Sequence, residues 1–137
     1  MSEEKLDLTS LVNAIARLSE GWARYQKDRT DIQIRDGLIQ RFEFTYEISH
    51  KMLKRHLETT SANPAGFDDM SFQDLIRMGN ERGLIPGSWP EWRNFRDMRA
   101  KTSHTYDEEI ALEVVACIPD FQREASFLLK KLQDAQA

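Results

Sequence analysis

Hydrophobic residues recur every three or four positions along almost the whole chain, and no stretch shows the sustained alternation of a strand. The first helical stretch runs from Leu8 to Tyr25 and fades into a polar run. The second begins near Asp31 and is long, with Phe44 and Ile48 adding hydrophobic surface on a separate face. A helix that is hydrophobic on more than one side usually packs against more than one neighbour, one of which could be a second subunit.

The middle of the chain contains shorter helical stretches separated by turn signals. Residues 59–70 are typical of a loop, because they contain Asn-Pro, Gly and a pair of Asp residues. Ser71 is a good N-cap for a short helix that Gly83 ends. Ser88 is a good N-cap for a further helix, which we expect to end between residues 100 and 104.

The last helix is predicted to start at Asp107, an N-cap followed by two glutamates that suit the positive end of a helix. Pro119 lies inside its hydrophobic pattern, so we expect a kink or a short break there. These elements together predict an all-α protein with a single domain over residues 1–137. The expected architecture is an antiparallel four-helix bundle with an additional short helix in the long crossover.

Length and composition fit a globular domain that needs neither disulfide nor metal to fold: 137 residues, 40% hydrophobic and 31% charged. The single cysteine, Cys117, cannot form an intrachain disulfide, and its place on a hydrophobic stripe predicts burial. The first ten residues lack the hydrophobic core of a signal peptide. No segment approaches the roughly 18 hydrophobic residues of a membrane span. We therefore expect a cytoplasmic protein with no membrane contact.

The net charge of −4 argues against nucleic acid as a partner, but the charge is unevenly distributed. Residues 41–57 contain four Lys or Arg against two Glu, and residues 88–106 contain four Arg or Lys against one Glu and one Asp. Two locally basic stretches could line a confined groove that binds phosphate. Ordinary solvated helix surfaces are the simpler interpretation of the charge alone.

Several kinds of site lack their sequence signature. There is no glycine-rich nucleotide loop, no HExxH and no pair of cysteines, so neither a cofactor nor a metal of its own is expected. His50 and His56 lie six residues apart, which is the wrong spacing for joint ligation on one helix face. Each is interpreted as a polar position at the edge of the bundle or of a subunit.

The remaining candidate for chemistry is the segment from Arg99 to Asp107. Arg99 and His104 are separated by about 140° on an ideal helix, so they can converge only if the helix ends between them. A histidine can take a proton from a hydroxyl and return it to a leaving oxygen, and an arginine can bind phosphate and stabilise the transition state. This scheme needs no metal, and a two-fold dimer would supply a second histidine.

A purely structural interpretation of the same segment is also open. In it, Arg99 pairs with a carboxylate, His104 caps the end of a helix and Tyr106 packs at the end of the bundle. The chain would then be a helical dimer whose motif serves the fold alone.

The pattern Arg99-x4-His104-x-Tyr106 matches the RX4HXY form of the motif that defines the HEPN superfamily. The chain also resembles the nucleotidyltransferase substrate-binding proteins over nearly its whole length. The wider match includes the phrase at residues 41–47 and the pairs at 114–115 and 118–119. One departure is Ala100, where relatives often carry Asn.

The resemblance implies a homodimer of helical bundles that forms a complex with a minimal nucleotidyltransferase (MNT) encoded nearby. It implies the toxin of a toxin–antitoxin pair, a metal-independent endoribonuclease in which Arg99 and His104 act on RNA. The chain would have no cofactor of its own, and the partner would use ATP to transfer AMP onto Tyr106. An older interpretation of the family makes the chain a non-catalytic subunit that presents a substrate to the nucleotidyltransferase.

Other side chains are supporting candidates in this site. Glu43 and Glu47 could orient Arg99 or His104, and they could equally be ordinary interhelical partners. The other supporting candidates, beside the motif itself, are Lys101 and Ser103. An AMP group on Tyr106 would bring negative charge and bulk next to His104, and both oppose RNA binding.

Overall fold

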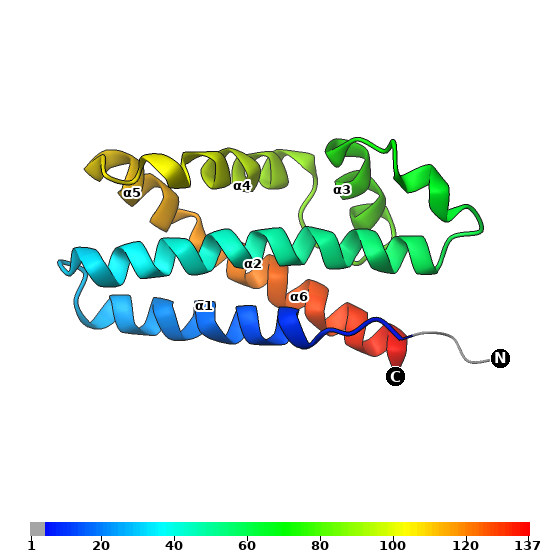
Figure 1. Cartoon of the computed structure of the whole chain (residues 1–137), viewed down its shortest axis with the longest axis horizontal. Helices are drawn as coiled ribbons and strands as arrows, with labels where there is room; N and C mark the ends of the chain where they lie inside the picture. The colour runs from blue at the N-terminus through cyan, green and yellow to red at the C-terminus, as the bar shows by residue number, and fades with distance from the viewer. Residues whose placement is uncertain (1–4) are drawn as a thin grey trace.

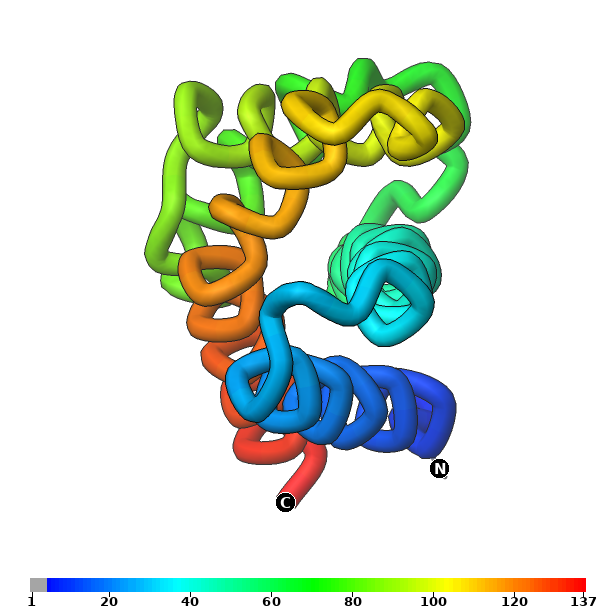
Figure 2. Tube along the Cα trace, turned by 90° about the vertical axis from the view of Figure 1, so that its left-hand side faces the viewer, coloured from blue at the N-terminus to red at the C-terminus, as the bar shows by residue number. Residues whose placement is uncertain are grey.

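The computed structural model describes residues 5–137, and all regular structure in that range is helical, as the periodicity predicts. The long helix α2 lies at the centre, antiparallel to α1 (Figure 1). Seen end-on in Figure 2, α2 has α1 below it, α4 and α5 above it and α6 along one side. The helices are α1 (Thr9–Lys27), α2 (Ile32–Thr59), α3 (Phe72–Glu81), α4 (Trp89–Lys101), α5 (Glu108–Ala116) and α6 (Ile118–Gln136), with 3-10 turns η1 (Pro64–Phe67) and η2 (Thr102–His104).

Three of the predicted helix starts are confirmed by their capping hydrogen bonds. Asp31 Oδ1 accepts from the backbone N–H of Ile34 at 3.1 Å, and Ser71 Oγ accepts from that of Asp74 at 3.1 Å. Asp107 Oδ1 accepts from the backbone N–H groups of Glu109 and Ile110, in the first turn of α5, at 3.0 and 3.3 Å. These oxygens satisfy amides that have no partner inside their helix.

Two other predicted helix boundaries are confirmed: the end of α3 at Gly83 and the start of α4 after Ser88. At Ser88, however, the expected capping hydrogen bond is not formed. Gly83 follows α3 with φ of +72°, a left-handed conformation that suits glycine. Ser88 precedes α4, but its side chain caps no amide, and its hydroxyl instead donates to Glu91 Oε2 at 3.0 Å.

The predicted last helix is divided into α5 and α6 at Cys117. Pro119 has no N–H to donate to the carbonyl four residues earlier, and its ring would clash with that carbonyl. It sits instead in the first turn of α6, where no such bond is required. The break changes the direction of the chain, so that α6 runs back across the bundle behind α2 (Figure 1).

An aromatic cluster joins α2, α4 and α6 in the core. Phe42, Trp92 and Phe121 are fully buried, and the rings of Phe42 and Phe121 pack edge to face at 5.2 Å. Phe95 packs against Phe121 in the same way at 5.3 Å. Cys117 is buried, as predicted. This packing fixes the register of α4 against the middle of α2.

A buried carboxylate secures the turn that leads into α4. Glu124 Oε1 accepts from the Gly87 backbone N–H at 2.9 Å and from Trp92 Nε1 at 2.8 Å. Burial raises the pKa of Glu124, and these two hydrogen bonds act in the opposite direction. The carboxylate thus ties the start of α4 to α6.

The two ends of the described chain meet beside α1. The backbone N–H of Leu6 donates to Gln136 Oε1 at 2.8 Å, and Gln136 Nε2 donates back to the Leu6 carbonyl at 3.0 Å.

Among residues 5–137, no helix is long and hydrophobic enough to cross a membrane. The prediction about a signal peptide falls partly on residues 1–4, which lie outside the described residues.

Candidate functional site

Helix α4 ends at Lys101, between Arg99 and His104, as the sequence predicts. The chain then tightens into η2, and the Asp107 backbone N–H donates to the His104 carbonyl at 3.1 Å. Arg99 lies in the last turn of α4 and contacts α2, whereas His104 is exposed to solvent beyond the end of the helix. Because the helix ends between them, Arg99 faces α2 while His104 faces solvent.

Two carboxylates on α2 hold Arg99. Its Nε donates to Glu47 Oε1 at 3.1 Å, and its Nη1 lies 3.9 Å from Glu43 Oε2. The hydroxyl of Thr102 donates to Glu43 Oε2 at 2.7 Å, which adds η2 to the cluster. Glu43 and Glu47 are four residues apart, so they lie on one face of α2. Both contact Arg99, and neither forms a hydrogen bond with His104.

The guanidinium of Arg99 retains a free edge. Its Nη1 also lies 3.4 Å from Thr102 Oγ1, but its Nη2 forms no hydrogen bond to residues 5–137. The side chain is 33% exposed. An anion could therefore approach Nη2 while Glu47 keeps the planar group in place.

His50 belongs to the same cluster, which the sequence analysis missed. Its Nε2 lies 3.2 Å from Glu47 Oε2, so Glu47 bridges His50 and Arg99. The imidazole packs on Tyr46 and Phe72, with ring centroids 5.2 and 5.4 Å away. Burial lowers the pKa of His50, which favours its neutral form. The signal in the sequence is the i, i+3 spacing of His50 from Glu47, whereas the sequence-based interpretation made His50 a polar position at the edge of the bundle.

His104 and Tyr106 lie on the surface beyond the end of α4, in and just after the 3-10 turn η2. The Tyr106 side chain is 87% exposed, and its ring packs edge to face with His104 at 6.1 Å. Neither side chain forms a hydrogen bond with another residue in the described part of the chain. Both are therefore accessible to a large substrate or to another protein.

Two of the supporting candidates do not join the cluster. The ammonium of Lys101 pairs with Glu113 on α5 at 2.7 Å, and the side chain of Ser103 is exposed without a hydrogen bond to residues 5–137. Over that same range, no three His, Cys, Asp or Glu side chains gather in a way that could hold a metal ion.

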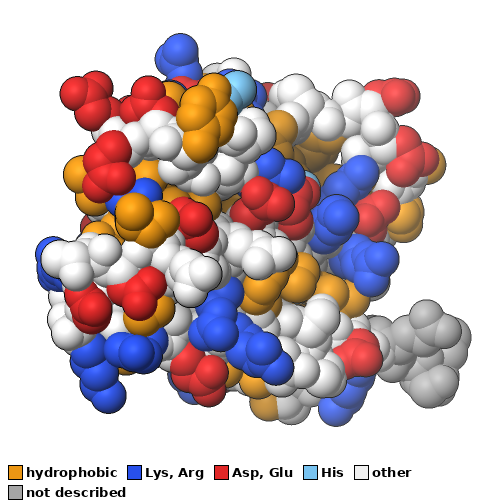
Figure 3. Space-filling model, turned by 60° about the vertical axis from the view of Figure 1, so that its left-hand side comes forward, with side chains coloured by type: hydrophobic (Ala, Val, Ile, Leu, Met, Phe, Trp, Pro, Cys, Tyr) orange, Lys and Arg blue, Asp and Glu red, His pale blue; other side chains and the backbone are white. Residues whose placement is uncertain are grey.

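A hollow lined by both polar and hydrophobic side chains lies between α1 and α2. Its volume is ≈ 640 Å³, and Phe44 and Ile48 form its α2 wall beside Asn13 and Arg17 of α1. Figure 3 shows this face, with carboxylates near its centre, Lys and Arg side chains to one side and hydrophobic side chains below. Acidic, basic and hydrophobic groups therefore adjoin one another on a single face.

Comparison with known proteins shows the family of the chain. Residues 6–134 match the family described as nucleotidyltransferase substrate binding protein like. The chain belongs to this family. A curated member from Haemophilus influenzae, a probable ribonuclease HepT, is 39% identical over 97% of this chain and 96% of its own length.

The fold also matches a solved structure from the same family. The Haemophilus influenzae protein HI0074, described as revealing the fold of a substrate binding domain of a nucleotidyltransferase, superposes with a TM-score of 0.85. It is 38% identical, and the match covers 93% of this chain and 99% of that one. The family as a whole is thus associated by name with a nucleotidyltransferase, and one curated member with RNA cleavage.

Proposed function

We propose that this chain is a metal-independent endoribonuclease, the toxin of a HEPN/MNT toxin–antitoxin pair, acting in the cytoplasm as a homodimer. The observation that carries the proposal is Arg99, oriented by Glu47 and open at Nη2, in the last turn of the helix that leads into the exposed His104. The 39% identity to a probable ribonuclease supports the same chemistry.

The reaction needs only side chains of this kind. His104 takes the proton of a ribose 2′-hydroxyl, whose oxygen attacks the adjacent phosphorus. The bond from phosphorus to the 5′-oxygen of the next nucleotide breaks, leaving a 2′,3′-cyclic phosphate. Arg99 stabilises the extra negative charge at the phosphorus, and a second histidine returns a proton to the leaving oxygen.

A homodimer supplies that second histidine from the other subunit. The half-buried Phe44 and Ile48 on α2 are suitable for its interface, because they expose hydrophobic surface close to the Arg99 cluster. A two-fold axis near this surface would bring two clusters to one groove.

The partner nucleotidyltransferase neutralises the toxin by modifying Tyr106. The phenol oxygen attacks the α-phosphorus of ATP, the bond to the β-phosphate oxygen breaks and pyrophosphate leaves. The 87% exposure of Tyr106 supports this access. The attached AMP then adds negative charge beside His104, where it opposes RNA by repulsion and bulk.

Expression of the chain alone tests the nuclease. We expect growth arrest and cleaved cellular RNA, with both effects abolished by His104→Ala. The purified chain should cleave RNA equally well in the presence of a chelator. Arrest that persists in a folded His104→Ala variant would refute the proposal.

Coexpression with the neighbouring nucleotidyltransferase tests the regulation. We expect mass spectrometry to find AMP on Tyr106 and growth to recover. Tyr106→Phe should stay toxic in the presence of the partner, because it lacks the acceptor oxygen. Recovery of that variant without any adduct would rule out this mechanism.

A second candidate is a non-catalytic subunit that presents a substrate to the nucleotidyltransferase. The family description favours it, as does the surplus of carboxylates around Arg99, which suits a cationic small molecule. It predicts intact RNA and partner-dependent transfer of nucleotide to an added substrate. Labelling of the chain itself and of nothing else would exclude it.

A further inference from the structure

The cluster that holds Arg99 is electrostatically unsuited to bind a polyanion by itself. Arg99 contributes one positive charge, and the two carboxylates that contact it, Glu43 and Glu47, contribute two negative charges. His50 adds none near neutral pH, since burial lowers its pKa. The net charge is therefore −1, although RNA binding requires neutralisation of phosphates by Lys or Arg.

The missing positive charge lies on the same face of α2. Residues 43, 47, 50 and 54 follow one another at spacings of three or four, so they form one stripe, with Lys51 at its edge. Lys51 is exposed and Lys54 partly so. Both also lower the pKa of His50 slightly, beside the larger effect of burial, which places their charges close to the cluster.

Neither lysine is neutralised by a neighbour. Within residues 5–137, no carboxylate oxygen lies within 4.0 Å of the ammonium of Lys51 or Lys54. By contrast, Lys101 pairs with Glu113 at 2.7 Å, and Lys130 pairs with Asp134 at 3.2 Å. Two unpaired cations beside a cluster of net negative charge are available for an external anion.

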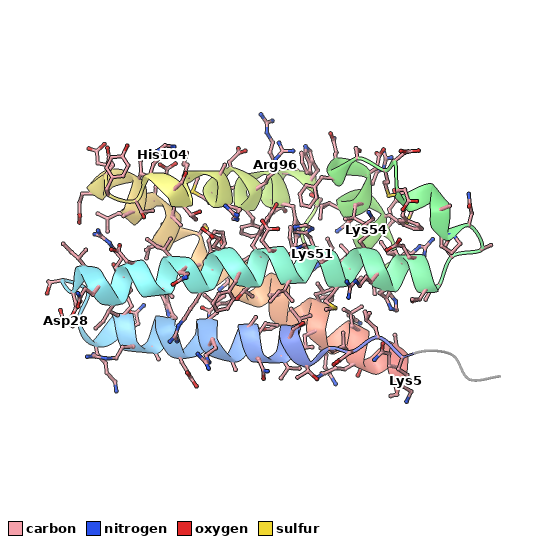
Figure 4. The ribbon with its side chains drawn as sticks, viewed as in Figure 1. Lys5, Asp28, Lys51, Lys54, Arg96 and His104 are labelled. Carbon is pink, nitrogen blue, oxygen red and sulfur yellow. The ribbon has the colours of Figure 1, made fainter. Side chains whose placement is uncertain are left out.

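We propose that Lys51 and Lys54 bind the backbone phosphates of the RNA strand where it leaves the Arg99 site, so that the strand runs along α2 toward α3. Figure 4 shows the order along the bundle: His104 lies beyond the end of α4, and Lys51 and then Lys54 lie along α2 in the direction of α3. Seven residues of helix separate Glu47 from Lys54, which is about 10 Å and matches about three stacked nucleotides. This inference rests on the proposed nuclease function, which it deepens.

In this proposal, Lys51 and Lys54 determine the affinity for the RNA strand, while Arg99 and His104 catalyse its cleavage. A single-stranded RNA oligonucleotide longer than three residues should bind more tightly than a dinucleotide, because only the longer one reaches Lys54. Its affinity should also fall steeply with salt, as counterion release requires.

The test compares two double variants that remove the same charge. One is Lys51→Ala with Lys54→Ala, and the matched control is Lys130→Ala with Lys131→Ala at the end of α6. Affinity for a labelled single-stranded RNA is measured at several salt concentrations in a His104→Ala background, which prevents cleavage. Cleavage kinetics are then measured with His104 intact, and circular dichroism checks the fold.

We expect the Lys51/Lys54 variant to bind about tenfold more weakly at moderate salt, with the salt slope reduced by about 1.4. KM should rise while kcat at saturating RNA is retained, and the control should match the parent protein. Unchanged affinity and slope, or an equal loss in the control, would overturn this inference while leaving the nuclease intact. A folded parent that neither binds nor cleaves RNA would overturn the inference and the proposed function together.

Discussion

Arg99 and Glu47 are joined across the α4–α2 interface by a hydrogen bond of 3.1 Å from Nε to Oε1. The bond uses the side of the guanidinium that faces α2 and leaves Nη2 free. The arrangement suits a residue that must meet a phosphate in one orientation, because the contact removes rotational freedom before the substrate arrives.

The Glu47→Gln variant tests whether Glu47 orients Arg99 for cleavage without contributing to RNA affinity. We expect kcat for RNA cleavage to fall by about tenfold to a hundredfold, because the amide holds Arg99 less firmly. RNA affinity should be retained or improved, since a negative charge is lost. The free energy of unfolding should fall by less than about 1 kcal/mol, because the pair is about one third exposed.

Glu113→Gln is the matched control for that change. It breaks the ion pair with Lys101, which is similarly exposed, without touching Arg99. An equal loss of kcat in both variants would mean that Glu47 acts only through general charge or stability.

Gly87 tests the packing at the start of α4. A Cβ at this position would lie 2.6 Å from Glu124 Oε1, so Gly87→Ala must displace a buried carboxylate. We expect a loss of about 1–3 kcal/mol in urea unfolding. Gly37→Ala is the control, because its Cβ would meet nothing within 4 Å and the residue lies inside α2. That change should stabilise the protein by about 0.5–1 kcal/mol.

Glu124 predicts a defined dependence of stability on pH. Burial raises its pKa in the folded state, so the folded protein holds this proton more tightly than the unfolded chain does. Its contribution to stability is therefore largest below the unfolded pKa of about 4.3 and declines as the pH rises through the folded pKa.

Glu124→Gln should remove this decline, since its amide oxygen can still accept from Gly87 and Trp92. Relative to the parent protein, the variant should gain in free energy of unfolding over the range in which the pH rises above about 4.3. Urea titrations across that range measure the difference. A difference that does not change with pH would contradict the prediction.

The proposed dimer is tested at Phe44, on the α2 wall of the hollow between α1 and α2. Phe44→Asp should shift the chain from dimer to monomer in light scattering, because a buried unpaired carboxylate destabilises an interface. Leu112→Asp on α5 is the control, since Leu112 is 48% exposed and lies on another helix. A parent protein that is already monomeric, or a Phe44→Asp variant that stays dimeric, would exclude this surface as the interface.

Local chemistry made much of the fold predictable. The all-α class follows from hydrophobic spacing, and the starts of α2, α3 and α5 follow from the capping oxygens of Asp31, Ser71 and Asp107. The division of the last helix follows from the missing N–H of Pro119. Each of these features depends on residues within one or two helical turns, so the sequence alone contains the information.

The candidate site could be predicted only in part from local sequence. The spacing and resemblance identify Arg99, His104 and Tyr106, and they name Glu43 and Glu47 without assigning their contacts. The role of His50 was missed, because the Glu47 spacing on the same helix was not considered and His50 was interpreted as a polar position at the edge of the bundle.

By itself, then, the sequence determined which segments are helical, where they begin and which residues can carry proton transfer and phosphate binding. Only the tertiary structure decided that Arg99 meets Glu43 and Glu47, that His50 shares Glu47, and that Lys101 turns away to Glu113. The physical reason is that contacts between helices depend on the rotation and register of α4 against α2. Those are set by the packing of Phe42, Trp92 and Phe121, which belong to three different helices and meet only in the folded core.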